Sequence, residues 1–363
     1  MKQSFVSLTL LLLLSVPSAS QAADLMDWLE EAGKALHTDE SADAGDHASL
    51  LTLEPAENEM YPRVSPDGNH LLVVSTHRGK SVISQRVLEN GDPINVVSDY
   101  DQQVMDSAAW YGPDKVTFLS YRENSLDLWE KPVDGGSVRK LYRRLDGELR
   151  FPVLLNNGEM IVARMTPKHG TAVGHRDRQT EATFIDWDRR GYQYNLTLIT
   201  EQGAEKMLSP GSNPALSPDG SRLVFTMQDG HFWHLFMMNT DGSDLVQLTS
   251  GEHVDAQPVW SPDGSWIAFT SNRGDEDEDD KDGGHSSKQQ RNWDIWLIGR
   301  DGSNLTRLTT NKASDGAPSF ANNGRIYFHS DRKVSREESK SHQVRGRTSG
   351  FHIWTILLPA KVS

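Results

Sequence analysis

The chain has 363 residues, a formal net charge of −14 and no cysteine. Without cysteine it has neither disulfides nor a lipid-modified cysteine anchor, and its acidic charge disfavours non-specific binding to nucleic acid. The length is large for one ordinary domain.

Residues 1–22, MKQSFVSLTLLLLLSVPSASQA, have the pattern of a secretory signal peptide. A basic start is followed by an apolar run and a site of small residues, so we expect cleavage after Ala22. The apolar run is too short to cross a membrane comfortably, and no other segment approaches the length needed. The sequence therefore predicts a soluble, monomeric mature protein in the periplasm.

Residues 23–47 are predicted to form an amphipathic helix followed by an acidic linker. The apolar residues of this helix recur at helical spacing. They are Leu25, Trp28, Leu29, Ala32 and Leu36. Two interpretations stay open: the helix packs its apolar face on the rest of the protein, or it is a tethered helix that binds a partner.

The stretch QPVWSPDGSWIAFTSNR, residues 257–273, raises the question whether Ser-Pro-Asp-Gly is a catalytic serine motif or a turn. A nucleophile elbow has the form G-x-S-x-G, which occurs nowhere in the chain. Proline presets φ and glycine accepts a positive φ, so Pro-Asp-Gly between two apolar runs is typical of a turn.

The same turn recurs with a period of roughly 40–50 residues, which indicates a repeat architecture. Strong copies begin at Tyr61 and Asn213, and weaker copies begin at Ala109, Phe151 and Ala317. Proline stands three residues before the turn in every copy except the one that begins at Ala109. These prolines are Pro62, Pro152, Pro214, Pro258 and Pro318.

Each repeat contains up to four short runs of β-branched and aromatic residues, as in AQPVW, WIAFTS, WDIWLIG and LTRLTT of the fifth repeat. Six such repeats predict an all-β, six-bladed β-propeller over residues 48–363. The last repeat ends after its third strand, so we expect the run HASLLTLE, residues 47–54, to supply the fourth strand and close the ring. We expect the recurring third-strand aromatics to pack between neighbouring sheets. They are Trp129, Phe236, Trp296 and Trp354.

Three repeats carry extra residues after their second strand, approximately at 166–191, 274–291 and 333–350. The strand order places all three insertions on one face, where long loops usually carry binding function. The second insertion is acidic at its start. It does not fit a calcium-binding EF-hand loop, because Asp280 stands where that loop requires glycine.

Acidic residues recur where the chain enters the innermost strand of a blade. Symmetry predicts that they form a ring at the mouth of the channel. The acids are Glu59, Asp106, Asp255 and Asp315, and the arginines at the end of the second strand are Arg78, Arg122, Arg164, Arg273 and Arg332. Two interpretations stay open: each acid holds its own blade's arginine in a salt bridge, or surplus acid at the mouth binds a divalent cation or a basic partner segment.

The motif WSPDGSWIAFTSNR followed by DIWLIGRDGSNLTRLT closely resembles the propeller repeat of the TolB family. The resemblance covers about residues 48–358 and is specific for the fold. It implies a periplasmic propeller that binds proteins through one face. Full-length members carry an α/β domain before the propeller, and we expect this chain to lack it because few residues precede the first strand.

Two functions follow from these patterns. The first is a non-enzymatic periplasmic scaffold that binds an envelope protein or peptide at the loop-rich face and needs no cofactor. The alternative is a metal-assisted polysaccharide lyase or hydrolase with its site over the channel. Its support is weaker, because the histidines show no tight ligand spacing and are interpreted as surface residues. The candidates are His77, His169, His175, His231, His234, His253 and His285.

Overall fold

The computed structural model describes most of the region predicted to be a propeller. The described ranges are 46–54, 58–77, 80–98, 107–120, 126–142, 148–167, 192–274, 292–345 and 348–359. The predicted signal peptide and N-terminal helix lie outside these ranges, as do most of the first two insertions. No helix among the described residues has the length and apolar character needed to cross a membrane.

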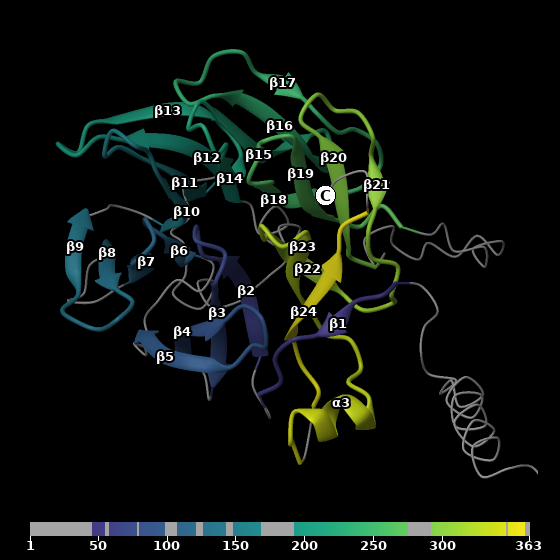
Figure 1. The fold of residues 1–363 in the computed structure, drawn as a ribbon. Coiled ribbons are helices and arrows are strands. Elements are labelled where there is room, and N and C mark those ends of the chain that lie inside the picture. The colour runs from purple at the N-terminus through teal and green to yellow at the C-terminus, as the bar shows by residue number, and fades with distance from the viewer. Residues whose placement is uncertain are drawn as a thin grey trace, which may run out of the picture. The chain divides into compact units, whose positions relative to one another are not determined.

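The strands form six four-stranded antiparallel sheets, which confirms the six-bladed β-propeller (Figure 1). In chain order, blade 1 contains β2 (Asn58–Val64), β3 (His70–His77), β4 (Lys80–Val87) and β5 (Pro93–Ser98); blade 2 contains β6 (Ala109–Trp110), β7 (Lys115–Ser120), β8 (Asp127–Pro132) and β9 (Arg139–Tyr142); blade 3 contains β10 (Glu148–Leu154), β11 (Met160–Pro167), β12 (Tyr192–Ile199) and β13 (Glu205–Pro210). Blade 4 contains β14 (Ser212–Leu216), β15 (Arg222–Asp229), β16 (Phe232–Asn239) and β17 (Val246–Gln247); blade 5 contains β18 (Asp255–Trp260), β19 (Trp266–Ser271), β20 (Asp294–Gly299) and β21 (Thr306–Arg307). Blade 6 contains β22 (Asp315–Phe320), β23 (Arg325–Ser330), β24 (His352–Leu357) and the N-terminal strand β1 (Ser49–Leu50).

The fourth strand of blade 6 comes from the beginning of the propeller region. Strand β1 pairs antiparallel with β24, with Ser49 opposite Thr355 and Leu50 opposite Trp354. Just beyond β1, the backbone N–H of Leu51 donates to the carbonyl of Ile353 at 2.8 Å. The edge of β24 that the last repeat would leave unpaired is thereby covered.

The core is built from aromatic pairs that repeat from blade to blade. In four blades, a fully buried phenylalanine on the second strand lies directly opposite the third-strand aromatic. The pairs are Phe118 with Trp129, Phe225 with Phe236, Phe269 with Trp296 and Phe328 with Trp354. Third-strand aromatics also pack against the preceding blade, as Trp129 does in one cluster with Leu72 and Trp354 in another with Ile295, which confirms the predicted packing between neighbouring sheets.

The Ser-Pro-Asp-Gly segments are turns, as predicted. At the turn after β18, the N–H of Gly264 donates to the carbonyl of Ser261 at 2.9 Å, and the Ser261 hydroxyl donates to the Asp263 carboxylate at 2.6 Å. The same hydroxyl accepts a bond from the N–H of Trp266 at 2.9 Å. This serine is buried and bonded within its turn, so it has no nucleophilic role.

The third insertion contains a short helix that the sequence analysis did not predict. Helix α3 (Arg336–Ser341) begins at Ser335, whose side chain accepts a bond from the N–H of Glu338, while the Glu338 side chain accepts from the N–H of Ser335. This capping box, Ser-x-x-Glu, is the local signal for a helix start. The three insertions lie between β11 and β12, β19 and β20, and β23 and β24, which are the second and third strands of their blades.

Candidate binding site at the central channel

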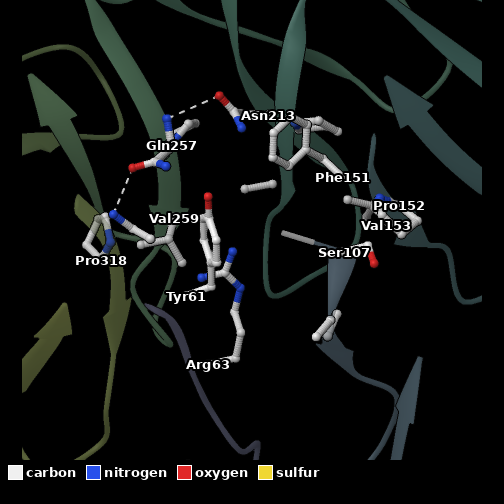
Figure 2. A pocket seen from close by; sticks show the side chains of 16 residues that line it. Tyr61, Arg63, Ser107, Phe151, Pro152, Val153, Asn213, Gln257, Val259 and Pro318 are labelled. Carbon is white, nitrogen blue, oxygen red and sulfur yellow. Dashed lines mark hydrogen bonds between the residues drawn. The ribbon is translucent and has the colours of Figure 1, made fainter. Parts of the chain in front are cut away.

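The innermost strands of the six blades surround a cavity of about 160 Å³, which we call the central channel (Figure 2). Every blade contributes to its wall. The described lining residues are Tyr61, Arg63, Ser107, Ala108, Ala109, Phe151, Pro152, Val153, Asn213, Pro214, Ala215, Gln257, Pro258, Val259, Ala317 and Pro318.

A repeated backbone irregularity shapes this wall. In five blades the innermost strand has a bulge, at which two of its residues lie opposite one residue of the second strand. The first bulged residue precedes the repeat proline and has a left-handed backbone although it is not glycine. These residues are Tyr61 (φ 51°), Phe151 (φ 52°), Asn213 (φ 48°), Gln257 (φ 52°) and Ala317 (φ 50°).

Left-handed backbone at a non-glycine residue costs about 1–3 kcal/mol, and such strain gathers at sites that hold ligands. In blade 2, Ala109 stands where the other blades have proline. There β6 pairs with β7 without a register shift, and no described residue of β6 has a positive φ. The bulge therefore occurs together with the proline, and it aims the side chain before the proline at the channel.

Hydrogen bonds link the bulged residues of neighbouring blades around the channel (Figure 2). The backbone N–H of Gln257 donates to Asn213 Oδ1 at 3.4 Å, and the N–H of Ala317 donates to Gln257 Oε1 at 2.8 Å. At the junction of blades 6 and 1, the N–H of Tyr61 donates to Nδ1 of His329 at 3.3 Å. The polar side chains thus serve both as channel wall and as links between blades.

Arg63 provides the only charge among the described lining residues. The nearby His329 side chain is buried, and burial together with the positive charge of Arg63 lowers the pKa of His329 to about 3. His329 is therefore neutral at physiological pH and can accept the bond from Tyr61 through Nδ1. The described wall combines one guanidinium with amide, hydroxyl and apolar groups and contains no carboxylate.

The three predicted acids that the structure describes lie in ion pairs inside the blades and are not among the described channel-lining residues. Asp255 and Asp315 are buried and contact the arginines predicted for their own blades, Arg273 and Arg332. Glu59 is also buried, but its partner is Arg86 on β4, at 3.0 Å.

The remaining predicted acid and arginines do not add further pairs between an acid and the predicted arginine of its own blade. Arg164, in blade 3, which lacks the acid, contacts Glu205 at 2.6 Å. Asp106, Arg78 and Arg122 lie outside the described residues. The local salt-bridge interpretation thus agrees with the geometry in blades 5 and 6, and a role in binding for any of these acids and arginines stays a prediction.

The interpretation of His234 as a surface residue was wrong. Its side chain is 3% exposed, and together with His253 it faces Asp255 across the boundary between blades 4 and 5. His231 is exposed because it stands just before β16, whereas β16 itself is buried on both faces. The sequence signal was a polar residue two positions before each third-strand aromatic, as in DLW, HLF, DIW and HIW.

In blades 4 and 6 the polar side chain marked by this signal meets an acid of the next blade. In blade 6 it is His352, whose Nδ1 lies 3.3 Å from Oε2 of Glu59 in blade 1. In the adjacent backbone, the N–H of Glu59 donates to the carbonyl of Phe351 at 2.7 Å. The same backbone link joins Asp315 to Trp293, at 2.8 Å.

The channel, the bulged inner strands and these joints define the class of protein: a six-bladed β-propeller whose blades are held together by buried polar links. Residues 183–278 match the TolB beta propeller domain family. This region thus carries TolB-type repeats, as the resemblance of its turn motif predicted.

Curated relatives match over short parts of their length. The chain is 30% identical over 158 residues to the "Uncharacterized peptidase YuxL" of Bacillus subtilis, which covers 37% of this chain and 24% of that protein. It is 46% identical over 44 residues to the "Tol-Pal system protein TolB" of Anaeromyxobacter dehalogenans, which covers 12% of this chain and 10% of that protein. The matches therefore span less than two thirds of either relative.

Among solved structures, a putative TolB from Agrobacterium tumefaciens is similar with a TM-score of 0.53 and 16% sequence identity. The alignment covers 86% of this chain and 94% of that chain. At this identity the likeness shows a shared fold.

Proposed function

We propose that this protein is a non-enzymatic scaffold of the bacterial envelope, which binds a protein or peptide segment over the loop-rich face and takes one of its side chains into the central channel. The observation that carries the proposal is the size and chemistry of the channel. A cavity of about 150 Å³ accommodates a group the size of benzene, and the channel has about 160 Å³. It therefore has room for one side chain.

The charge of the wall favours an acidic or neutral polar group from the partner. Arg63 is the charged lining residue among those described, and Asn213 and Gln257 add amides. A guanidinium is suited to bidentate binding of a carboxylate. A basic segment or a divalent cation would gain little there, because the three described acids, Glu59, Asp255 and Asp315, are buried in ion pairs.

A location in the periplasm is part of the same proposal. Residues 1–22 have the pattern of a signal peptide, which would direct the chain to export, and one matched relative is named a Tol-Pal system protein. The partner would accordingly be an envelope protein or a peptide segment of one.

Metal-assisted cleavage of a polysaccharide at the channel has less support. Pockets that enclose a drug-sized ligand occupy about 300–1,000 Å³, which is well above the volume of this cavity. An oligosaccharide would have to bind outside the channel, on loops that include undescribed residues.

The test compares partners recovered from an envelope extract by the parent protein and by Arg63→Glu. We expect the charge reversal to remove at least one specific partner, because a carboxylate would then face a carboxylate. The matched control is Arg222→Glu, an exposed arginine on blade 4 outside the channel. Both variants must melt like the parent. If Arg63→Glu recovers the same partners in the same amounts as the control, the channel does not take part in binding.

A further inference from the structure

His234, His253 and Asp255 converge at the boundary between blades 4 and 5. One ligand atom from each lies within 4.8 Å of the other two. His234 Nδ1 and His253 Nε2 are each 3.6 Å from the same carboxylate oxygen, Asp255 Oδ2. We propose that these three side chains form a binding site for a zinc-type transition-metal dication, distinct from the central channel.

The two ring nitrogens are buried without hydrogen-bond partners among the described residues. A separation of 3.6 Å is too long for a hydrogen bond to a carboxylate, and a buried polar atom left without a partner is costly. Both atoms point at one anionic oxygen, so a small cation between the three groups would satisfy all of them at once.

The joint between blades 6 and 1 shows what an ordinary histidine–acid contact looks like in this fold. There His352, at the repeat position of His234, has Nδ1 3.3 Å from Oε2 of Glu59 and Nε2 3.2 Å from the carbonyl oxygen of Thr348. Both of its nitrogens have partners within hydrogen-bond distance. The joint at Asp255 differs in its wider spacing and in the addition of a second histidine, His253.

The two nitrogen–oxygen distances of 3.6 Å agree with tetrahedral coordination. Zinc binds imidazole nitrogen and carboxylate oxygen at about 2.0–2.2 Å, so neighbouring ligand atoms of a tetrahedral site are separated by roughly 3.3–3.6 Å. Two imidazoles and one carboxylate leave a fourth position open. The His253 side chain is 14% exposed, so this side of the cluster reaches the surface.

Neighbouring residues hold the Asp255 carboxylate in place and leave space for the imidazole of His253. Arg273 contacts both oxygens of Asp255, and the Ser271 hydroxyl donates to Asp255 Oδ1 at 2.6 Å. Such outer contacts fix a ligating carboxylate in place. At Gly251, an added Cβ would come within 2.4 Å of Cε1 of His253, so the absence of a side chain there gives the imidazole its room.

These neighbours also determine which metal the site would take. The positive charge of Arg273 opposes any cation, so binding depends on strong bonds to imidazole. Calcium and magnesium prefer six or more oxygen ligands, whereas zinc, copper and nickel accept nitrogen. The site therefore selects a transition metal over calcium or magnesium.

The test titrates the full chain, purified without a histidine tag, with ZnCl₂ by calorimetry, and with CaCl₂ and MgCl₂ in parallel. We expect one saturable zinc site and no calcium or magnesium binding there. Co²⁺ provides a second readout, because its visible absorption reports tetrahedral coordination. The chain has no cysteine, so that signal would come from nitrogen and oxygen ligands.

His253→Ala removes the most exposed of the three ligands and is the variant expected to fold. It should weaken zinc binding by at least about 10–100-fold, the loss known for outer contacts of metal sites, and abolish the tetrahedral Co²⁺ spectrum. His231→Ala, which removes an exposed histidine just before β16, should leave both unchanged. The proposal is overturned if the parent binds no zinc, or if His253→Ala binds zinc and shows the Co²⁺ spectrum like the parent.

Discussion

Replacing Arg332 by alanine should be among the most damaging single changes in the described propeller. Its guanidinium lies between two buried carboxylates, donating to Asp315 Oδ2 at 2.6 Å and to Asp46 Oδ1 at 2.5 Å. It also lies over the rings of Phe328 and Trp354, at 5.3 and 5.6 Å from their centroids. Asp46 directly precedes residues 47–54, which complete blade 6. The ion pair with Arg332 therefore holds this N-terminal segment against the blade.

The magnitude follows from a comparison with the same repeat position in blade 5. Arg273 also lies over two aromatic rings, but it contacts a single carboxylate, that of Asp255. Breaking one buried ion pair costs about 3–5 kcal/mol, which is the loss expected for Arg273→Ala. Because Arg332 makes additional charged hydrogen bonds to Asp46, we expect Arg332→Ala to cost about 1.5–3 kcal/mol more.

The assay is unfolding in guanidinium chloride followed by tryptophan fluorescence, with the parent and both variants measured side by side. Adding Asp46→Asn to Arg332→Ala should restore part of the loss, because it removes a buried charge that has lost its partner. Equal losses for Arg332→Ala and Arg273→Ala, or no recovery in the double variant, would refute the closing role assigned to Arg332.

Three further predictions concern closure, pH and the channel links. Deleting residues 48–54 should expose the edge of β24 and cause aggregation; a deletion variant that stays monomeric and melts like the parent in light scattering and calorimetry would contradict this. Lowering the pH from 7 to 5 should cost about 2 kcal/mol of unfolding free energy through His329, because the unfolded histidine binds a proton near pH 6.5 while the folded one, with its pKa lowered to about 3, does not. In the His329→Gln variant the unfolding free energy should fall less between pH 7 and pH 5. An unchanged fall would show that other groups cause it. Gln257→Ala removes the acceptor for the N–H of Ala317 and should lower stability by about 1–3 kcal/mol, whereas a denaturation midpoint equal to the parent's would show that the link contributes nothing.

The fold could be predicted because its signals are local and repeated. Turn chemistry, the period of the repeat and the third-strand aromatics each depend on residues close together in the chain. The missing fourth strand of the last repeat likewise pointed to residues 47–54, of which β1 pairs with β24. The capping box of α3 was equally local, but it lies in an insertion for which only a position on the loop-rich face was predicted.

The partners of the buried acids and histidines were harder to predict, because some of these contacts join residues of different blades. Symmetry placed Asp255 and Asp315 at equivalent positions correctly, but it could not say whether their side chains face the channel or their own arginines. Their burial settles that geometry, since a buried carboxylate needs a charged partner. The meeting of His234 with His253 crosses a blade boundary and has no fixed spacing in the sequence.

The channel-lining residues had a visible signal that symmetry reasoning did not use. The signal is the repeat proline itself, since a bulged residue with left-handed backbone precedes it in five blades, while that residue varies from Tyr61 to Ala317. Its orientation could not be read from alternation along the strand, because the bulge shifts the register. Only the three-dimensional backbone shows that these side chains line one cavity.

Partner binding at the loop-rich face can be measured by photo-crosslinking from the two ends of strand β22. Lys312 and Asn322 are both exposed; the first precedes β22 on the loop-rich face, and the second follows it on the opposite face. A photoreactive amino acid is placed at one position or the other, and the protein is made in cells. We predict a specific crosslinked partner from position 312 and none from position 322. Crosslinks from position 322 alone, or the same product from both positions, would show that partners do not bind specifically at the loop-rich face.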